Sequence, residues 1–230
     1  MSPAGPVRPV TIALDGPAAS GKSTVARAVA RRLSLPHLDT GAMYRAATLK
    51  ALAKGVSPGD GEALRRLLET TDIDLSDGKV LLDGEDVTEQ IRDAAVTGAV
   101  SQVAAQAPVR EWMVERQRHL LGERGGVMEG RDIATVVLPG ADFKFFLTAT
   151  PEERARRRAA ELRARGVATS VGDVLGEIEA RDSTDSKREA SPLRVAPGAR
   201  VIDSTGRTVD EVVDEIVEAT RDGHGQDGGG

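Results

Sequence analysis

The 230-residue chain contains no cysteine, and aromatic side chains make up only 2% of it. Without cysteine the chain has no disulfide bond, no thiol nucleophile and no cysteine-based zinc site. No run approaches about 18 consecutive apolar residues, and residues 1–9 lack the apolar segment of a signal peptide. We therefore expect a cytoplasmic protein that does not associate with a membrane. Its core must consist of aliphatic side chains, because so few aromatic ones are available.

Charge and length narrow the class further. Charged residues make up 29% of the chain and hydrophobic residues 40%, as in a soluble globular protein. The formal net charge of −5 argues against nucleic acid as a partner, although local arginine clusters could still hold phosphate groups. The length suits one large domain or a domain with an insert, and nothing in the sequence requires more than a monomer.

The most informative stretch is Gly16–Ser23, which has the pattern G-x-x-x-x-G-K-[ST]. It follows Val10–Asp15, a short apolar run typical of a buried strand, and leads into Lys22–Leu33, whose apolar residues recur at helical spacing. A strand, a glycine-rich turn and a helix together form a phosphate-binding loop, because the N–H groups of the turn and the positive end of the helix dipole face the anion. The alternative is a glycine-rich turn that has this pattern by chance.

Within this loop, Lys22 would neutralise charge on a β- or γ-phosphate, and the Ser23 hydroxyl would bind Mg²⁺. Gly16 and Gly21 can adopt the positive φ angles that let successive N–H groups point inward at an anion. We therefore predict a nucleotide-phosphate site formed by Gly16, Pro17, Ala18, Ala19, Ser20, Gly21, Lys22, Ser23 and Thr24.

Strands and helices alternate along the rest of the chain. Further strands are predicted at 127–129, 141–148 and 201–202, with a short strand or turn at 35–41. Helices are predicted at 42–54, 61–69, 151–165 and 171–187, in two pieces from residue 93 that meet near 107–108, and from residue 209 onward. This alternation predicts an α/β fold, in which helices cover both faces of a parallel sheet and ligands lie beyond the carboxyl ends of its strands.

A small β-unit interrupts this alternation. Two Asp-Gly pairs, at 77–78 and 83–84, separate short β-prone runs, and such pairs are hairpin signals. We predict an inserted β-unit over about 70–92, within a domain that spans 10–220. Residues 1–9 are predicted to be a flexible N-terminus, and the polar, glycine-rich residues 221–230 a disordered tail.

Three segments are expected to meet at one edge of the sheet. The phosphate loop follows the first strand, Asp39-Thr40 ends the short strand after it, and Gly130–Asp132 follows the strand at 127–129. Because ligands in such sheets bind at the carboxyl ends of the strands, these segments should open on a single crevice.

The helix at 151–165 is rich in arginine: Arg154, Arg156, Arg157, Arg158, Arg163 and Arg165 lie on it or at its end. Arg154 and Arg158 are four residues apart on one face and could reach over the nucleotide, where a migrating phosphoryl group needs cations around its oxygens. The alternative is a solvated helix face whose arginines pair with glutamates on the same helix.

A second group of charges is more selective. On a helix, Arg181, Asp185 and Arg188 fall at i, i+4 and i+7 and share a face. A carboxylate between two guanidinium groups suits an acceptor site, in which the aspartate holds a ribose hydroxyl and the arginines hold a phosphate. The alternative is a salt-bridge ladder within the helix.

Taken in order, these residues resemble the bacterial cytidylate kinases, a family of P-loop nucleoside-monophosphate kinases. The resemblance runs from about residue 10 to residue 218. It is carried by Gly16–Thr24, Asp39–Arg45, Ser101–Ala104, Val109–Arg110, Glu129–Ile133, Thr135–Val137 and Arg181–Leu193. The first pattern is widespread, whereas the combination of D-[ST]-G-A-x-Y-R, E/D-G-R-D and R-D-x-x-D-x-x-R is far narrower. Thr40 stands where many members have serine, and Glu129 where some have aspartate.

The resemblance implies a fold, a reaction and a set of roles. The fold would be a P-loop kinase core with a nucleoside-monophosphate-binding insert and a short arginine-rich lid over about 151–170. The reaction would transfer the γ-phosphoryl group of ATP to CMP or dCMP with Mg²⁺, and the loop 16–24 would bind ATP. The implied acceptor-phosphate residues are Thr40, Arg45, Arg131 and Arg188; Arg181 and Asp185 would hold the ribose; Ser101, Arg110 and Asp132 would read the cytosine. The implied catalytic residues are Lys22, Arg131, Arg154, Arg158 and Arg188.

Two alternatives belong to other functional classes. A GTPase switch would use the same loop, but the chain lacks the N/T-K-x-D element of guanine-specific members. An ATPase that binds nucleic acid would need basic surfaces bearing aromatic residues, which the composition does not favour. The nearest alternative is another nucleoside-monophosphate or small-molecule kinase.

Overall fold

The core of the protein is a five-stranded parallel sheet. The computed structural model describes residues 10–76, 78–188 and 191–224. The sheet has the strand order β2-β6-β1-β7-β8. Its strands are β1 (Thr11–Asp15), β2 (His37–Asp39), β6 (Gly126–Gly130), β7 (Phe143–Thr148) and β8 (Arg200–Asp203). The predicted α/β class is confirmed, and β1 occupies the centre of the sheet.

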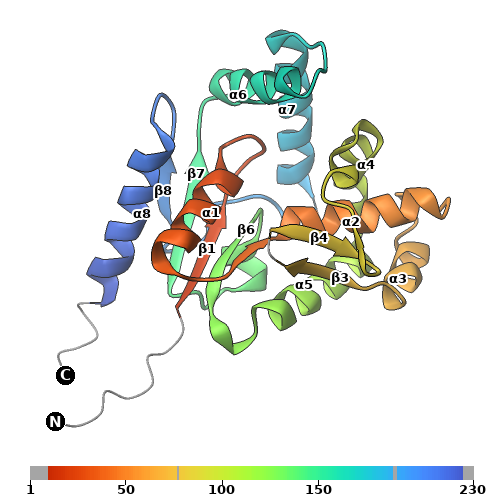
Figure 1. Cartoon of the computed structure of the whole chain (residues 1–230), viewed down its shortest axis with the longest axis horizontal. Coiled ribbons are helices and arrows are strands. Elements are labelled where there is room, and N and C mark those ends of the chain that lie inside the picture. The colour runs from red at the N-terminus through yellow and green to blue at the C-terminus, as the bar shows by residue number, and fades with distance from the viewer. Residues whose placement is uncertain (1–9, 77, 189–190, 225–230) are drawn as a thin grey trace.

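The side chains of successive residues in β1 point to opposite faces of this sheet, as in any β-strand. Ile12 and Leu14 pack into a cluster with α1 (Lys22–Leu33) and α8 (Val209–His224), which contact each other (Figure 1). Ala13 packs on the opposite face against the end of α5 (Ala107–Leu121) and a short π-helix, η3 (Ile133–Val137). The first strand therefore places the phosphate loop between two packed layers.

A second apolar core lies beside the sheet. Its elements are α2 (Thr40–Ala53), α3 (Gly61–Glu69), β3 (Ile73–Ser76), β4 (Lys79–Leu82), β5 (Glu85–Asp86), the 3-10 helix η1 (Gln90–Arg92), α4 (Ala94–Ala104) and α5. β3, β4 and β5 form an antiparallel sheet in which Ile73 pairs with Leu82, at the place predicted for an inserted β-unit. That this unit binds the acceptor nucleotide stays a prediction.

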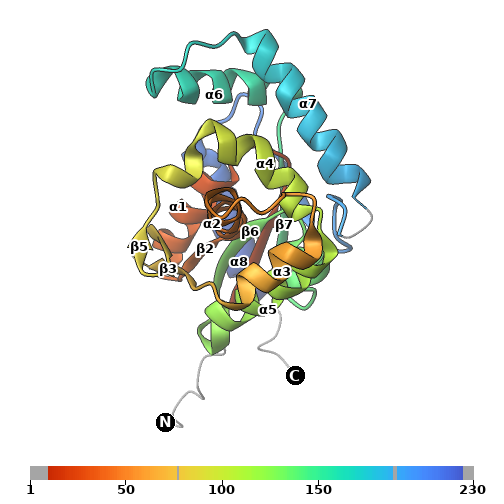
Figure 2. The same ribbon diagram turned by 90° about the vertical axis from the view of Figure 1, so that its right-hand side faces the viewer.

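The pair α6 (Pro151–Ala164) and α7 (Val171–Lys187) forms an arm at the top of the molecule (Figures 1 and 2). Alanines of α6 pack against Val174 and Ile178 of α7. Thr150 begins α6 as the sequence predicts: its hydroxyl accepts the Glu153 N–H at 3.3 Å, and proline occupies the first turn. The position of this arm suits the predicted lid, whose movement stays a prediction.

Two features differ from the sequence prediction. Residues 133–137 form the π-helix η3, which the sequence analysis did not foresee. The helix α8 continues to residue 224, so the prediction of a disordered tail is wrong for residues 221–224. Residues 225–230, and the predicted flexible segment 1–9, lie outside the described residues.

One sequence expectation concerned membranes. Across the described parts of the chain, no helix combines the length and the apolar character that crossing a bilayer requires.

Candidate functional site

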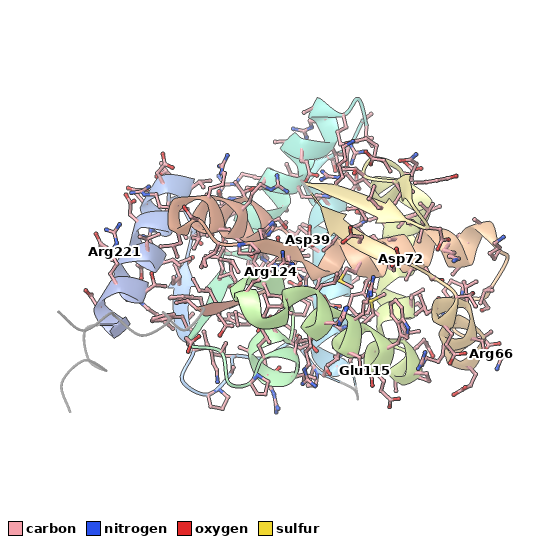
Figure 3. The ribbon with its side chains drawn as sticks, turned by 60° about the horizontal axis from the view of Figure 1, so that its bottom comes forward. Asp39, Arg66, Asp72, Glu115, Arg124 and Arg221 are labelled. Atoms are coloured by element: carbon pink, nitrogen blue, oxygen red, sulfur yellow. The ribbon has the colours of Figure 1, made fainter. Side chains whose placement is uncertain are left out.

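The predicted site residues gather at one edge of the main sheet. β2, β6 and β1 are neighbours, and all run in the same direction, so the segments after them leave the sheet side by side. The prediction that Gly16, Thr40 and Arg131 lie at the same edge is confirmed. Figure 3 shows Asp39, the last residue of β2, near the middle of the molecule, between the end of α8 at Arg221 and the α3 side at Arg66.

The phosphate loop wraps around its own lysine. Lys22 is buried, and its ammonium group donates to the Pro17 carbonyl at 2.6 Å and to the Ser20 hydroxyl at 3.3 Å. Gly16 has a φ of 153°, and a Cβ there would lie 2.0 Å from the Leu147 carbonyl oxygen, so no other residue fits. The loop is thus held by strand β7 and by contacts within itself.

Lys22 is a cation without an anionic partner at hydrogen-bond distance among the described residues. Burial lowers the pKa of Lys22 well below its usual value, and the nearby positive charge of Arg131 lowers it further. An anion placed on the loop would reverse both effects, because it would supply the missing counter-charge.

Beside the loop, a buried carboxylate joins three elements. Glu129 of β6 accepts the Ser23 hydroxyl at 2.8 Å with one oxygen and lies 3.0 Å from His37 Nε2 with the other. Asp39 pairs with Glu129 in the strand register, and its pKa is raised by burial and by that neighbouring carboxylate. His37 was not predicted as a site residue. The sequence signal that could have identified it is its position two residues before Asp39, which places both residues on the same face of β2.

The predicted acceptor face of α7 is completed from another segment. Asp185 accepts Arg131 Nε at 2.9 Å and forms an ion pair with Arg188 at 3.0 Å, and both Asp185 and Arg188 are buried. Burial alone would raise the pKa of Asp185, but Arg131, Arg188 and Arg181 outweigh it and hold the pKa below the usual range. This pairing with Arg131 is not part of a ladder within the helix.

The helix α7 ends at Lys187, so Arg188 is its C-cap, and the prediction that Arg188 lies on the helix face is wrong. Arg181, which does lie on α7, differs from Asp185 and Arg188 in its pairing. It forms no ion pair with another described residue, and its Nε atom is buried without a hydrogen-bond partner. Burial, followed by the positive charge of Arg131, lowers the pKa of Arg181 to about 9. The ladder alternative is therefore wrong for Arg181, whose side chain is held ready for an acceptor that the protein itself does not provide.

Two of the three residues predicted to read a base lie together. Arg110 of α5 is buried, donates to Asp132 and to the Ala104 carbonyl (3.2 Å), and stacks over the Tyr44 ring at 5.7 Å from the centroid. Ser101 lies on α4 less than one turn before Ala104, and its hydroxyl makes no hydrogen bond to another described residue. The contact of Arg110 with the Ala104 carbonyl links the Arg110–Asp132 pair to the end of α4, the helix that carries Ser101.

The remaining predicted acceptor residues also contact the protein. The Thr40 hydroxyl donates to the Glu129 carbonyl at 2.7 Å. Arg45 of α2 donates to the Ile91 carbonyl at 3.1 Å and to the Thr97 hydroxyl at 2.9 Å. Thr97, which the sequence analysis left out, therefore holds the Arg45 guanidinium from α4. Burial, and then the nearby Arg158, lower the pKa of Arg45.

The arginines of α6 that contact the phosphate loop are not the pair that the sequence predicted. Arg154 is buried and donates to the Ala18 carbonyl of the phosphate loop at 3.2 Å and to Asp182 at 2.5 Å. Arg158 instead pairs with Glu161 at 2.8 Å and makes no hydrogen bond to the loop within the described chain, as the solvated-face alternative expected. Arg157, which the sequence analysis left unassigned, donates to the Ser20 carbonyl at 3.4 Å and to the Ser204 carbonyl at 2.7 Å. The missed signal is the i, i+3 spacing of Arg154 and Arg157, which also places two residues on one face.

Together these contacts make a site for two anions. Arg131 follows Gly130, which pairs with Asp15 just before the phosphate loop, and it donates to Asp185 of α7. Its positive charge lowers the pKa of both Lys22 and Arg181. The positive charge of Arg158 likewise lowers the pKa of Arg45, and the charges of Arg45 and Arg158 lower that of Arg181. Buried cations that face one another lose this mutual repulsion when anions bind between them. The arrangement can therefore hold one phosphate on the loop and a second one opposite it.

Comparison with known proteins identifies the family. The family model described as cytidylate kinase matches residues 12–222. The chain is 54% identical over 215 residues to a protein named cytidylate kinase from Geobacillus kaustophilus, covering 92% of this chain and 96% of that one. It is 50% identical over 212 residues to the protein of the same name from Caldanaerobacter subterraneus, covering 92% and 95%.

A solved structure supports the fold alone. An uncharacterized protein from Eubacterium ventriosum superimposes with a TM-score of 0.51 at 11% sequence identity, covering 91% of this chain and 97% of that one. The family model and the relatives each match nine-tenths of the chain or more. The matched part includes the phosphate loop, the arm and the predicted acceptor cluster, which consists of Arg131, Arg181, Asp185 and Arg188. The chain belongs to the cytidylate kinase family.

Proposed function

We propose that this kinase transfers the γ-phosphoryl group of ATP to CMP or dCMP, giving ADP and CDP or dCDP in one direct in-line step. The observation that carries the proposal is the position of Arg131. It donates to Asp185 of the acceptor cluster, and its charge acts on Lys22 of the phosphate loop. A residue in that position faces both the group that leaves ATP and the group that receives it. Catalysis would then consist of positioning and of charge stabilisation, because the acceptor phosphate is itself the nucleophile.

On the donor side, the loop 16–24 would bind the phosphates of ATP through its N–H groups and Lys22. Arg154 would add a charge next to the Ala18 carbonyl of this loop, where it is already anchored. Arg158 would have to release Glu161 before it could bind the migrating group. Closure of the arm would also exclude water, which otherwise competes with CMP for the phosphoryl group.

The residues around Ser23 fit a magnesium ion that arrives with ATP. The Ser23 hydroxyl donates its hydrogen to the buried Glu129, so its oxygen lone pairs remain available to a cation. Ser23 would be the direct ligand, and Glu129 would accept hydrogen bonds around it. When bound, Mg²⁺ would neutralise charge on the β- and γ-phosphates. No group of three or more His, Asp or Glu side chains within the described chain could hold a metal by itself.

On the acceptor side, the roles follow the chemistry of each group. Arg45, Arg131 and Arg188, with the Thr40 hydroxyl, would bind the phosphate of CMP, since guanidinium groups match phosphate oxygens bidentately. Asp185 and Arg181 would bind the ribose hydroxyls. Arg181 has an unsatisfied buried donor, which a ribose or phosphate oxygen would satisfy.

Base recognition would depend on Asp132, Arg110 and Ser101. A carboxylate can only accept hydrogen bonds, so Asp132 suits the amino group of cytosine and repels the carbonyl of uracil at the same position. Arg110 and the Ser101 hydroxyl would donate to the N3 and O2 acceptors of the base. A base that leaves these buried groups unpaired is rejected strongly.

An acceptor screen tests this proposal. The purified enzyme would be assayed for ADP release with CMP, dCMP, UMP, AMP, shikimate and dephospho-CoA at equal concentrations. We expect CMP and dCMP to be the best acceptors and UMP to follow at a distance. The Lys22→Met variant, purified in the same way, controls for contaminating kinases. Faster turnover of AMP or shikimate than of CMP would contradict the proposal. The monomeric state and the cytoplasmic location stay predictions.

A further inference from the structure

A buried aspartate outside the predicted site joins the phosphate loop to the base-reading segment. Asp15 is the last residue of β1 and directly precedes Gly16. Its side chain is buried, and its two carboxylate oxygens accept the N–H groups of Ile133 and Ala134, each at 2.8 Å. No role described above uses this carboxylate.

The two N–H groups belong to the first turn of the π-helix η3. The first N–H groups of any helix have no partner within the helix and are usually satisfied by the side chain of the N-cap residue. In η3 the N-cap residue is Asp132, and aspartate is among the residues preferred there. Yet Asp132 makes no capping hydrogen bond, and its carboxylate accepts from Arg110 instead. Asp15 therefore performs from a distant strand the capping that Asp132 would ordinarily perform.

We propose that Asp15 is a positioning residue for base recognition: by capping η3, it leaves the Asp132 carboxylate free to face Arg110 and the cytosine. This inference rests on the proposed function, because it assumes that Asp132 reads the base. It also explains why a short run rich in β-branched residues forms a helix at this point, since the carboxylate of Asp15 fixes its first turn.

The consequence of losing Asp15 follows from local competition. An aspartate at the N-cap can accept the N–H of the second or third helical residue, which here are Ala134 and Thr135. Once the Ala134 N–H loses Asp15, Asp132 can satisfy it by turning away from Arg110. Base discrimination should then suffer more than the binding of ATP, which the loop holds through its own backbone.

The test compares acceptors in an Asp15→Asn variant. Asparagine has the same shape, but its amide has only one acceptor oxygen. Its NH₂ group would face the second N–H donor and could not form a hydrogen bond with it. We expect the ratio of kcat/KM for CMP to that for UMP to fall at least about fivefold, while KM for ATP changes less than about twofold. In an Asp132→Asn background, the same change should narrow the ratio no further, because both substitutions act through one carboxylate.

Asp60→Ala is the control for the loss of a helix cap. Asp60 caps α3, where its carboxylate accepts the Ala63 N–H at 2.9 Å on the exposed surface. Loss of a helix cap there should lower the melting temperature without changing the CMP to UMP ratio. A merely structural role for Asp15 would give the same pattern as Asp60.

The outcomes separate this inference from the proposed function. A wild-type enzyme that does not prefer CMP would contradict the proposed function. A wild-type enzyme that prefers CMP, with an Asp15→Asn variant that keeps the full preference, would overturn the inference alone.

If Asp15→Asn does not fold, the wild-type enzyme provides a second test. Burial raises the pKa of Asp15 to about 6, with Lys22 and Asp132 as the charged groups that act on it. The ratio should therefore fall as the pH drops below about 6, when one oxygen becomes a donor. Titration of the phosphate cancels in this ratio because CMP and UMP share that group. A ratio that is constant from about pH 5.5 to 8 would overturn the inference.

Discussion

The donor side and the acceptor side of the site are built in different ways. On the donor side, one continuous segment supplies the loop and its lysine, and Lys22 donates to a carbonyl of the same loop. On the acceptor side, two guanidinium groups meet carboxylates from other elements: Arg110 of α5 meets Asp132, and Arg131 meets Asp185 of α7. The two sides are joined at Arg131, at the Asp15 contact with η3 and through Glu129, which accepts Ser23 and Thr40. Arg154 also links them, because it donates to Ala18 of the loop and to Asp182 of α7. Mutations away from these links should affect one side without the other.

This difference indicates which mutations should affect one substrate and which should affect both. A loop held largely by its own backbone keeps its shape when a distant element shifts, so its function should depend mainly on its own residues. The acceptor cluster depends on how α2, α4, α5, the end of β6 and α7 are placed, so changes there should affect CMP selectively.

The largest effect is expected from Lys22→Met. Loss of the loop charge should raise the activation free energy by about 3 to 4 kcal/mol, which lowers kcat at least about a hundredfold. The affinity for CMP should stay within about threefold of the wild-type value. Steady-state kinetics at saturating ATP, with calorimetry of CMP binding, measure both. Lys50→Met is the control, since Lys50 lies on α2 and pairs with Asp83. Retention of more than about a tenth of the wild-type turnover would break the comparison on the donor side.

Asp185→Ala should affect the opposite substrate. Removal of this carboxylate leaves Arg131 and Arg188 without their buried partner and removes a proposed ribose ligand. We expect KM for CMP to rise about 30-fold or more, about 2 kcal/mol, while KM for ATP changes little. Asp173→Ala, at the other end of α7, is the control. An unchanged KM for CMP would show that the Asp185 pairings are structural only.

Asp132→Asn should change the choice of base. The amide can donate to the uracil carbonyl, which the carboxylate cannot do. The CMP to UMP ratio of kcat/KM should narrow at least about tenfold, or about 1.4 kcal/mol. Competition assays with both acceptors in one reaction give the ratio directly. Equal losses on the two substrates would mean that Asp132 orients its neighbours without reading the base.

The smallest effect concerns stability and Asp15, where the two sides join. Its pKa is raised from 3.8 to about 6, so the folded protein binds this proton more tightly than the unfolded chain does. Stability from this group is therefore present at low pH and is lost as pH rises through about 6, by about 1 kcal/mol between pH 5 and 7. The free energy of unfolding of Asp15→Asn relative to wild type should improve by that amount over this range. A pH-independent difference between the two proteins would contradict the assignment.

The parts of the site that the sequence predicts are those built from local signals. The phosphate loop follows a continuous pattern with a strand before it and a helix after it, and the structure has that order. The β-unit at 70–92 was predictable because Asp-Gly pairs specify tight turns, and Gly78 and Gly84 do adopt positive φ. The gathering of Thr40 and Arg131 at one edge followed from the parallel sheet.

Contacts between distant segments could not be predicted in this way. The sequence of η3 favours a strand, and its helix depends on a carboxylate that lies more than a hundred residues earlier in the chain. Helical spacing alone did not distinguish Arg157 from Arg158, because the choice depends on where Ser20 and Ser204 lie. The link from His37 through Glu129 to Ser23 likewise exists only because β2 and β6 are neighbours.

A crystal structure of the enzyme with CMP and ADP would show directly whether the two substrates bind as proposed. The account predicts that the cytosine amino group lies within hydrogen-bond distance of Asp132, and that the ribose contacts Asp185. It also predicts that the CMP phosphate lies among Arg45, Arg131 and Arg188, opposite the phosphate loop. CMP bound elsewhere, or with its base turned away from Arg110 and Asp132, would contradict the account.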